Sequence, residues 1–197
     1  MFEISRADKT EVDAREQISE IFAEGFTQWL GYFSKDENII AKAFAHMFVL
    51  EQFYVAIDGN KIVGMIACTN GYNPSVKLDY AELQKNFGFF KGIIARLFLK
   101  KEFEGGIDNS SPQKASIEFV GTSTNYRGKG VATQILKYIL DNTSFSEYVI
   151  DEVADTNIPA ISLYKKLGFM EYKRKSVSPK VAKKIGINNF VSLIYTK

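Results

Sequence analysis

The chain has 197 residues, of which 46% are hydrophobic. That length and composition fit one folded domain and exclude a disordered chain. Its 25 basic and 23 acidic side chains give a net charge of +2, so overall charge offers no reason to expect binding to nucleic acid or to an anionic membrane. One cysteine, Cys68, and one histidine, His46, exclude an intramolecular disulfide and a zinc site of the usual Cys/His kind, and we expect no bound metal.

The N-terminal residues carry no recognisable targeting signal. Residues 1–6 lack the basic and apolar regions of a signal peptide, and no stretch reaches the roughly 20 apolar residues of a transmembrane helix. We therefore expect a cytoplasmic protein, with membrane binding unlikely on charge grounds. Cys68 ends the apolar run 62–68, so we expect a buried, structural thiol.

The first quarter of the chain reads as one strand and two helices. Residues 2–6 are strand-like, and residues 10–25 have apolar side chains near helical spacing. We expect Gly25 and Gly31 to bracket an aromatic-rich connection. A second helix is expected over about 36–48, where the apolar positions form one broad face.

A hairpin follows, and after it a long irregular segment. The strands are expected at 52–57 and 61–69, because Asp-Gly between two apolar runs is a strong hairpin signal. Within an insertion of about 71–114, a helix is expected over roughly 78–103, weakened by two glycines. Its apolar face leaves three roles open: packing on the domain, covering the acceptor site or forming a homodimer contact, and lying on a membrane. The acidic residues of the segment rank the membrane last.

The second half alternates between strand and helix. Residues 115–121, 130–140 and 148–153 read as strand, helix and strand, which predicts a parallel pair joined by a crossover. A helix over 157–167 is expected to tolerate Pro159 in its first turn and to stop at Gly168. The last strands are expected at 169–175 and 190–196. The fold class is therefore α+β, with a mixed sheet.

The segment 117–133 is the most informative part of the sequence. A strand runs into a glycine-bearing loop that opens a helix, and the free N–H groups of a helix N-terminus bind phosphate oxygens. Arg127 and Lys129 add positive charge, while Gly128 and Gly130 permit close approach to the backbone. The spacing matches neither a Walker loop nor a Rossmann fingerprint. Taken alone, Arg-Gly-Lys-Gly also fits an exposed basic turn.

These residues resemble the GNAT superfamily of N-acetyltransferases. Arg127-Gly128-Lys129-Gly130-Val131-Ala132 is similar to the family's Arg/Gln-x-x-Gly-x-Gly/Ala loop, which binds the pyrophosphate of acyl-CoA through backbone amides. The second resemblance is the run 157–169, with Asn first, Tyr164 on the helix and Leu-Gly-Phe at its end. The resemblance covers roughly 115–173. It implies a single domain over 1–197, with a central sheet of about six or seven strands flanked by helices and the insertion between the third and fourth strands.

The resemblance also implies a cofactor site for acetyl-CoA. The strand before the loop is expected to lend backbone groups to the pantetheine arm, at a junction splayed from the strand that includes 147–153. A proline is usual in the family where Thr124 stands. The residues implied in cofactor binding are Val120, Gly121, Thr122, Arg127, Gly128, Lys129, Gly130, Val131, Ala132, Thr133, Asn157 and Tyr164.

Tyr164 is the first candidate for catalysis. Asn157 and Tyr164 are seven residues apart, so they lie on one face of a helix. The resemblance gives Tyr164 the role of donating a proton to the leaving thiolate and Asn157 that of bonding the cofactor's arm. The alternatives are a packed tyrosine and a simple helix cap.

Glu118 is the second candidate, as the general base that deprotonates an attacking amine. Period-two alternation places it on the same face as Val120 and Thr122. A structural carboxylate paired with a neighbour fits the sequence equally well. His46 is expected to be a packed or solvent-edge side chain.

The resemblance implies an N-acetyltransferase that moves an acetyl group from acetyl-CoA to a primary amine by direct attack in a ternary complex. The sequence leaves the acceptor open between a small-molecule amine and a peptide or protein amine. The aromatic stretch between the first two helices, about 22–36, is where the family builds its acceptor site. The alternative function is a non-catalytic acyl-CoA sensor or an interaction module.

Overall fold

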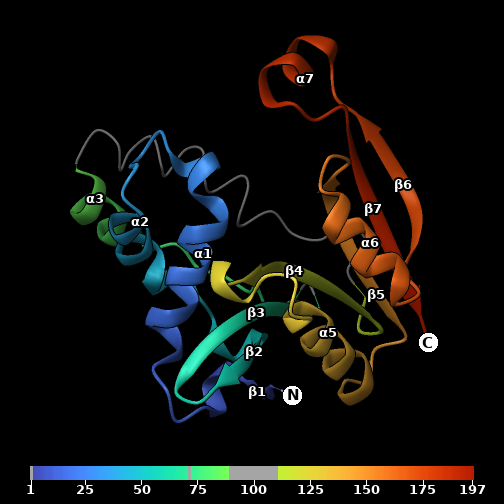
Figure 1. Ribbon diagram of the computed structural model, residues 1–197, viewed down its shortest axis with the longest axis horizontal. Helices are drawn as coiled ribbons and strands as arrows, with labels where there is room; N and C mark the ends of the chain where they lie inside the picture. The colour runs from blue at the N-terminus through green and yellow to red at the C-terminus, as the bar shows by residue number, and fades with distance from the viewer. Residues whose placement is uncertain (1, 71, 89–110) are drawn as a thin grey trace.

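The computed structural model describes residues 2–70, 72–88 and 111–197, without the side chains of residues 27–29. The described chain is organised around one sheet of seven strands in the order β1-β2-β3-β4-β5-β7-β6 (Figure 1). Only β4 and β5 pair in parallel, and every other neighbouring pair is antiparallel. This confirms the mixed sheet and the parallel crossover pair expected from the sequence.

The strands lie where the sequence places them. The Asp58-Gly59-Asn60 segment turns β2 back into β3, and Gly59 adopts the positive φ of 62° that this turn requires. The strand bounds are β1 (Glu3–Arg6), β2 (Phe53–Asp58), β3 (Lys61–Thr69), β4 (Lys114–Thr122), β5 (Glu147–Ala154), β6 (Met170–Ser176) and β7 (Asn189–Thr196).

The helices α1 (Ala14–Leu30) and α2 (Glu37–Phe44) cover one face of the sheet. Asp13 and Asp36 begin them by accepting hydrogen bonds from backbone N–H groups of the first turn. The expectation that α1 ends at Gly25 is wrong. The helix continues to Leu30, because burial of its apolar stripe outweighs the roughly 1 kcal/mol that an interior glycine costs.

The opposite face carries α5 (Val131–Asn142) and α6 (Ile158–Lys166). The buried side of α5 is the expected one and consists of Val131, Ile135, Leu136, Ile139 and Leu140. Its first turn lies very close to β3, since a Cβ added at Gly64 would clash with Val131. Pro159 lies in the first turn of α6, and Gly168, with φ 94°, follows its end as expected.

The long connection between β3 and β4 begins with a segment that pairs with the chain just after α2. Val76 forms an antiparallel bridge with Phe48, and α3 (Tyr80–Phe87) follows. The continuous helix expected over 78–103 is wrong in its middle, because Gly88 ends α3 with φ 81°. The remainder of that expected helix lies outside the described residues.

The C-terminal hairpin contains a helix that the sequence analysis did not assign. It is α7 (Pro179–Ile185), between β6 and β7, and it stands away from the sheet in Figure 1. Pro179 opens the helix, and Gly186 closes it with φ 72°.

The junction between β4 and β5 is short. The two strands pair only over Lys114–Ser116 and Glu147–Val149, although each continues for several residues. Past that point each strand has an irregularity in its pairing with its other neighbour. Phe119 on β4 has φ 50° and Glu152 on β5 has φ 54°, both in the left-handed region. The splayed junction expected from the sequence is therefore present.

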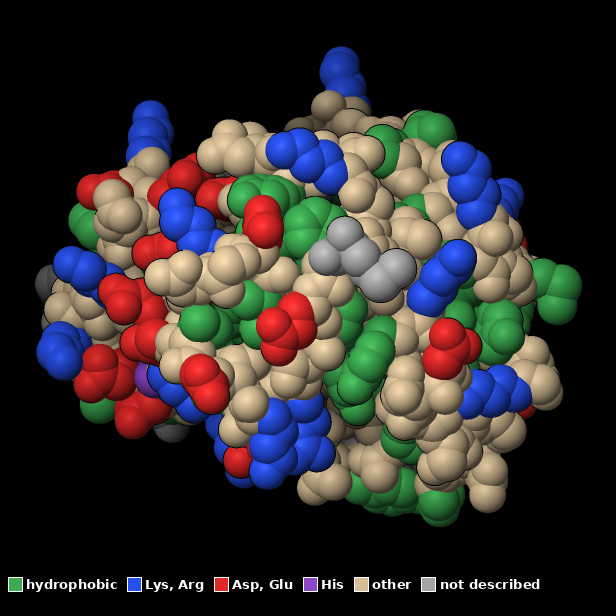
Figure 2. Space-filling view, turned by 60° about the horizontal axis from the view of Figure 1, so that its bottom comes forward, with side chains coloured by type: hydrophobic (Ala, Val, Ile, Leu, Met, Phe, Trp, Pro, Cys, Tyr) green, Lys and Arg blue, Asp and Glu red, His purple; other side chains and the backbone are tan. Residues whose placement is uncertain are grey.

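Two surface properties complete the description. Basic and acidic side chains are interspersed over the face drawn in Figure 2. Among the described residues, no helix has both the length and the apolar character needed to cross a bilayer.

Candidate active site

The loop between β4 and α5 presents unpaired backbone donors. Gly128 and Gly130 adopt φ values of 75° and 77°, and Gly130 is the residue from which α5 starts. The first helical bond runs from the N–H of Gln134 to the carbonyl of Gly130 (3.0 Å), so the N–H groups of residues 131–133 have no partner within the described chain. With no acidic residue in the first turn of α5, this terminus suits an anion.

Two cations stand beside these donors. Arg127 and Lys129 are both exposed. The Arg127 Nε donates to the carbonyl of Thr122 (3.4 Å), and the Lys129 ammonium lies 4.8 Å from the centre of the Tyr126 ring. Open space above Gly128 and Gly130 would accommodate a phosphate group. The residues predicted to bind pyrophosphate thus lie together.

The strand that leads to the loop borders the splayed junction. Val120 packs against the buried side chains between the sheet and the helices α5 and α6, while Gly121 and Thr122 are half-buried. A Cβ added at Gly121 would lie 3.0 Å from Ile21 Cγ2 and 3.1 Å from the methyl of Met65, so a larger residue there would push on α1 and β3. These three residues occupy the place at which the pantetheine arm is expected.

Tyr164 is the buried polar side chain of α6. It is 4% exposed and packs against Phe169, with a ring-centre distance of 6.1 Å. Burial raises the pKa of its phenol to about 12, so the group stays protonated at neutral pH. In the described part of the chain, no hydrogen bond is made by its hydroxyl. The side chain is therefore a neutral donor that is free to bond a bound group.

Asn157 caps α6, as predicted. Its side-chain oxygen accepts the N–H of Ala160 (3.3 Å), which leaves its amide N–H₂ group available. A contact with the cofactor remains a prediction.

Glu118 lies on the α1–α2 face of β4, and its carboxylate accepts a hydrogen bond from Ser75 Oγ at 2.5 Å. Its strand partner Ala67 belongs to the cluster on that face. The expectation that Glu118 shares a face with Val120 is wrong, because the bulge at Phe119 shifts the alternation by one residue. Glu118 is hydrogen-bonded and half-buried, which suits both a base and a structural carboxylate.

The remaining singled-out side chains are structural. Cys68 is 7% exposed, as expected, and burial, helped by the charge of Glu118, raises the pKa of its thiol to about 12. His46 is half-buried, and its Nε2 accepts the N–H of Asp79 at 2.8 Å. Burial lowers the pKa of His46.

The sequence did not indicate that Glu24 contacts the loop. The carboxylate of Glu24, on α1, bonds Ser123 and Thr124 at the start of the loop. The sequence carries no signal for this pairing, since Glu24 and Thr124 are 100 positions apart.

The arrangement of strand, anion-binding loop and splayed junction agrees with comparison to known families. The model of the acetyltransferase (GNAT) family matches residues 15–169, which is most of the chain. The chain belongs to this family. The resemblance, the mixed sheet and acetyl-CoA as the donor are thereby confirmed.

Three relatives illustrate the similarity. N-alpha-acetyltransferase 30 of Schizosaccharomyces pombe is 27% identical over 124 residues, which are 61% of this chain and 59% of that protein. The chain therefore matches little more than half of this relative's length. An N-acetyltransferase from Staphylococcus aureus Mu50 has the same fold, with a TM-score of 0.64 and 18% identity over 98% of this chain and all of that one. YncA of Salmonella typhimurium, solved with acetyl-CoA, has a TM-score of 0.57 and 15% identity over all of this chain and 94% of that one.

The residues present fit acetyl-CoA. The unpaired donors of residues 131–133, with the two cations, suit a pyrophosphate, and the gap in β4–β5 pairing leaves strand groups unpaired for an amide-bearing arm. When bound, the molecule supplies an acetyl group activated as a thioester.

Proposed function

We propose that this GNAT protein transfers an acetyl group from acetyl-CoA to a primary amine, by direct attack within a ternary complex. Arg127–Thr133 hold the pyrophosphate, Val120–Thr122 align the arm and Asn157 bonds it. Tyr164 donates a proton to the departing sulfur, and Glu118 accepts a proton from the amine directly or through water.

The observation that carries the proposal is the state of Tyr164. Its phenol is protonated, buried and without a hydrogen-bond partner in the described chain, and it lies on the helix that follows β5. Although the ring is buried, the hydroxyl oxygen is not among the enclosed polar atoms, so a bound group can reach it. A departing thiolate would give it a hydrogen-bond partner.

The step balances in atoms and charge. The amine nitrogen forms a bond to the acetyl carbon, and the carbon–sulfur bond breaks. The sulfur takes up the proton that Tyr164 donates, and the nitrogen loses one to Glu118 or to water. Since amines are mostly protonated at neutral pH, a base beside the acceptor raises the fraction that can attack.

We further propose that the acceptor is the amine of a peptide or protein. Support comes from the 27% identity to a protein named as an N-alpha-acetyltransferase. A small-molecule amine is the competing outcome of the acceptor screen described next.

Calorimetric titration of acetyl-CoA into the wild type and a Gly130→Glu variant tests the cofactor site. The introduced carboxylate repels the pyrophosphate, and a residue with a side chain is strained at φ 77°, so binding should be lost in the variant. No binding to folded wild type would overturn the proposal.

An acceptor screen then compares peptides that have free N-termini, peptides that have only a lysine amine, and small amines. Tyr164→Phe preserves the packing of the ring and removes the proton donor, so turnover should fall roughly 10- to 1,000-fold with unchanged acetyl-CoA affinity. Acetyl-CoA binding with no acceptor in any class, and a Tyr164→Phe variant indistinguishable from wild type, would instead indicate a non-catalytic sensor.

A further inference from the structure

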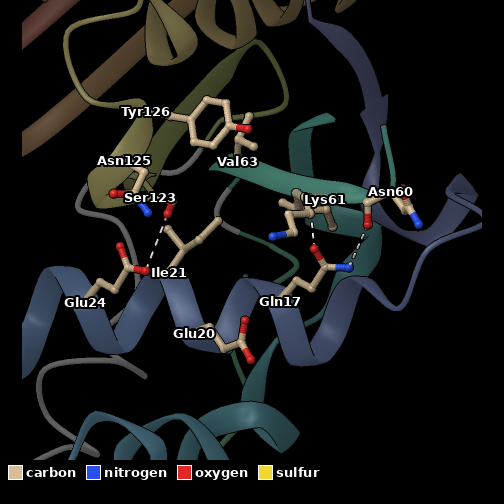
Figure 3. A pocket seen from close by; sticks show the side chains of 11 residues that line it. Gln17, Glu20, Ile21, Glu24, Asn60, Lys61, Val63, Ser123, Asn125 and Tyr126 are labelled. Atoms are coloured by element: carbon tan, nitrogen blue, oxygen red, sulfur yellow. Dashed lines mark hydrogen bonds between the residues drawn. The ribbon is translucent and has the colours of Figure 1, made fainter. Parts of the chain in front are cut away.

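The loop predicted to hold the pyrophosphate is anchored to α1 by one carboxylate. The Glu24 Oε2 accepts the backbone N–H of Thr124 at 2.7 Å and the Thr124 hydroxyl at 2.9 Å. Its Oε1 accepts the hydroxyl of Ser123 at 3.4 Å. Figure 3 shows the Glu24 side chain reaching from the helix toward Ser123. Glu24 therefore binds both residues from which the loop begins.

Beyond Thr124, the loop is tied to the body of the protein mainly through Tyr126, whose ring contacts Phe2 and packs against the buried cluster below α5. Ser123 donates its N–H to Val63 (3.0 Å), and the Tyr126 hydroxyl donates to Asp58 (2.8 Å). The other bonds from residues 124–129 are short-range, within the loop or to the end of β4. Residues 127–130 are all exposed. The exposed part of the loop thus depends on the ties at its start, of which the Glu24 carboxylate is one.

A cavity of about 440 Å³ lies beside the anchor (Figure 3). It is bordered by α1, by residues 60–63 of the turn and β3, and by Ser123, Asn125 and Tyr126 of the loop. Glu20 and Glu24 both line it from the same helix. Glu20 makes no hydrogen bond or ion pair within the described chain, so only one of the two carboxylates holds the loop.

We infer that Glu24 is a positioning residue for acyl-CoA binding: it fixes the start of the loop so that the backbone donors of residues 131–133 are ordered before the pyrophosphate arrives. Binding to a pre-ordered loop avoids the entropy of ordering it, which raises affinity without any direct contact. The inference rests on the proposed cofactor site and adds to it a residue from the opposite face of the sheet.

The direction in which acetyl-CoA affinity changes when Glu24 is removed distinguishes anchoring of the loop from charge repulsion. A carboxylate near the pyrophosphate site repels an anion, so charge alone predicts that removing Glu24 tightens acetyl-CoA binding. Loss of the anchor predicts weaker binding. Because the two mechanisms have opposite signs, a measured dissociation constant decides between them.

The experiment is calorimetric titration of acetyl-CoA into Glu24→Ala, with Glu20→Ala as the matched control. Glu20→Ala removes the same charge from the same helix and cavity. We expect Glu24→Ala to weaken binding roughly 3- to 30-fold, the loss of one charge-assisted hydrogen-bond network, and Glu20→Ala to leave it within about twofold.

Two further variants keep the test independent of folding defects. Thr124 is exposed, so Thr124→Val should fold, and it removes only the hydroxyl donor; we expect a smaller loss, and Thr124→Ser should restore affinity. In turnover assays, the KM for acetyl-CoA should rise in Glu24→Ala while kcat stays within about twofold.

Tight or tighter binding by folded Glu24→Ala, or an equal loss in Glu20→Ala, would overturn the inference and leave the cofactor site intact. Failure of the wild type to bind acetyl-CoA would instead remove the site itself. The two failures are therefore distinguishable.

Discussion

Ser75 donates its hydroxyl to the carboxylate of Glu118 at 2.5 Å, across 43 positions of sequence. Ser75 is 3% exposed and belongs to the start of the long β3–β4 connection. Its carbonyl accepts the N–H of Val49, and the neighbouring Lys77 donates its N–H to Met47 (2.7 Å). The connection is thus bonded to the segment that follows α2, and within the described residues it supplies the one hydroxyl that bonds the candidate base.

Ser75→Ala should lower turnover without changing the affinity for acetyl-CoA, because the carboxylate loses its orientation while the cofactor loop is untouched. We expect a roughly 3- to 30-fold loss in kcat, with recovery in Ser75→Thr, which retains the hydroxyl. Glu118→Gln serves as the reference for complete loss of the base. A Ser75→Ala variant with wild-type kcat would contradict the role.

His46 should make stability depend on mildly acidic pH. Its Nε2 accepts the N–H of Asp79, which requires the unprotonated ring, and burial lowers its pKa below the ordinary value. The stabilisation is therefore complete above about pH 6.5 and is lost as pH falls through the lowered folded pKa.

Thermal unfolding at neutral and mildly acidic pH, for wild type and His46→Gln, checks this. Glutamine can still accept the Asp79 N–H and does not titrate, so its melting temperature should fall less than that of the wild type on acidification. Equal falls in both proteins would show that His46 contributes nothing to the pH dependence.

Cys68 should resist thiol reagents in the native state. Burial raises the pKa of its thiol to about 12, so very little thiolate is present at pH 8. The side chain is also only 7% exposed, so a reagent reaches it poorly. We expect a reaction with an aromatic disulfide reagent at least roughly 100-fold slower than in urea-unfolded protein. Because Cys68 is the only cysteine, the signal has one source. Rapid labelling of the folded protein would contradict the burial.

Substitution by glycine should change stability differently at Phe119 and Glu152, the two non-glycine residues described with positive φ. Phe119 packs against the rings of Phe22, Phe26 and Phe53, so Phe119→Gly should destabilise the protein by roughly 1–3 kcal/mol, after relief of backbone strain is counted. Among the described residues, the exposed Glu152 bonds only Lys175, in a surface ion pair, so Glu152→Gly should stay within about 1 kcal/mol of wild type. Urea unfolding measures both, and similar losses would show that packing is not what separates them.

Local sequence patterns predicted the strands and the order of the elements, because alternation, turn residues and helix caps act within a few positions. They failed where longer-range packing or one backbone angle decides. Gly25 marks no helix end because α1 is buried along its length, whereas Gly88 ends α3 at a positive φ. Ser178-Pro179 and Gly186 are typical of a helix start and a helix end, and they would have predicted α7.

In the candidate site, too, local motifs were predicted and long-range contacts were not. The loop Arg127–Thr133, Asn157 and Tyr164 were found because each motif is contiguous. Ser75 and Glu24 were not assigned their roles, because their partners lie 43 and 100 positions away and only the fold brings them together. The face of Glu118 was predicted wrongly, because a bulge cannot be seen in a period-two pattern.

The three-residue pairing of β4 with β5 divides the sheet into two parts. Strands β1–β4 form one part of the sheet and β5–β7 the other. The two parts pair only between Lys114–Ser116 and Glu147–Val149. Residues of β2, β3, β5 and β7 share one buried cluster, so the two parts are joined by packing as well as by this short pairing. The six paired residues therefore set where the gap between β4 and β5 begins.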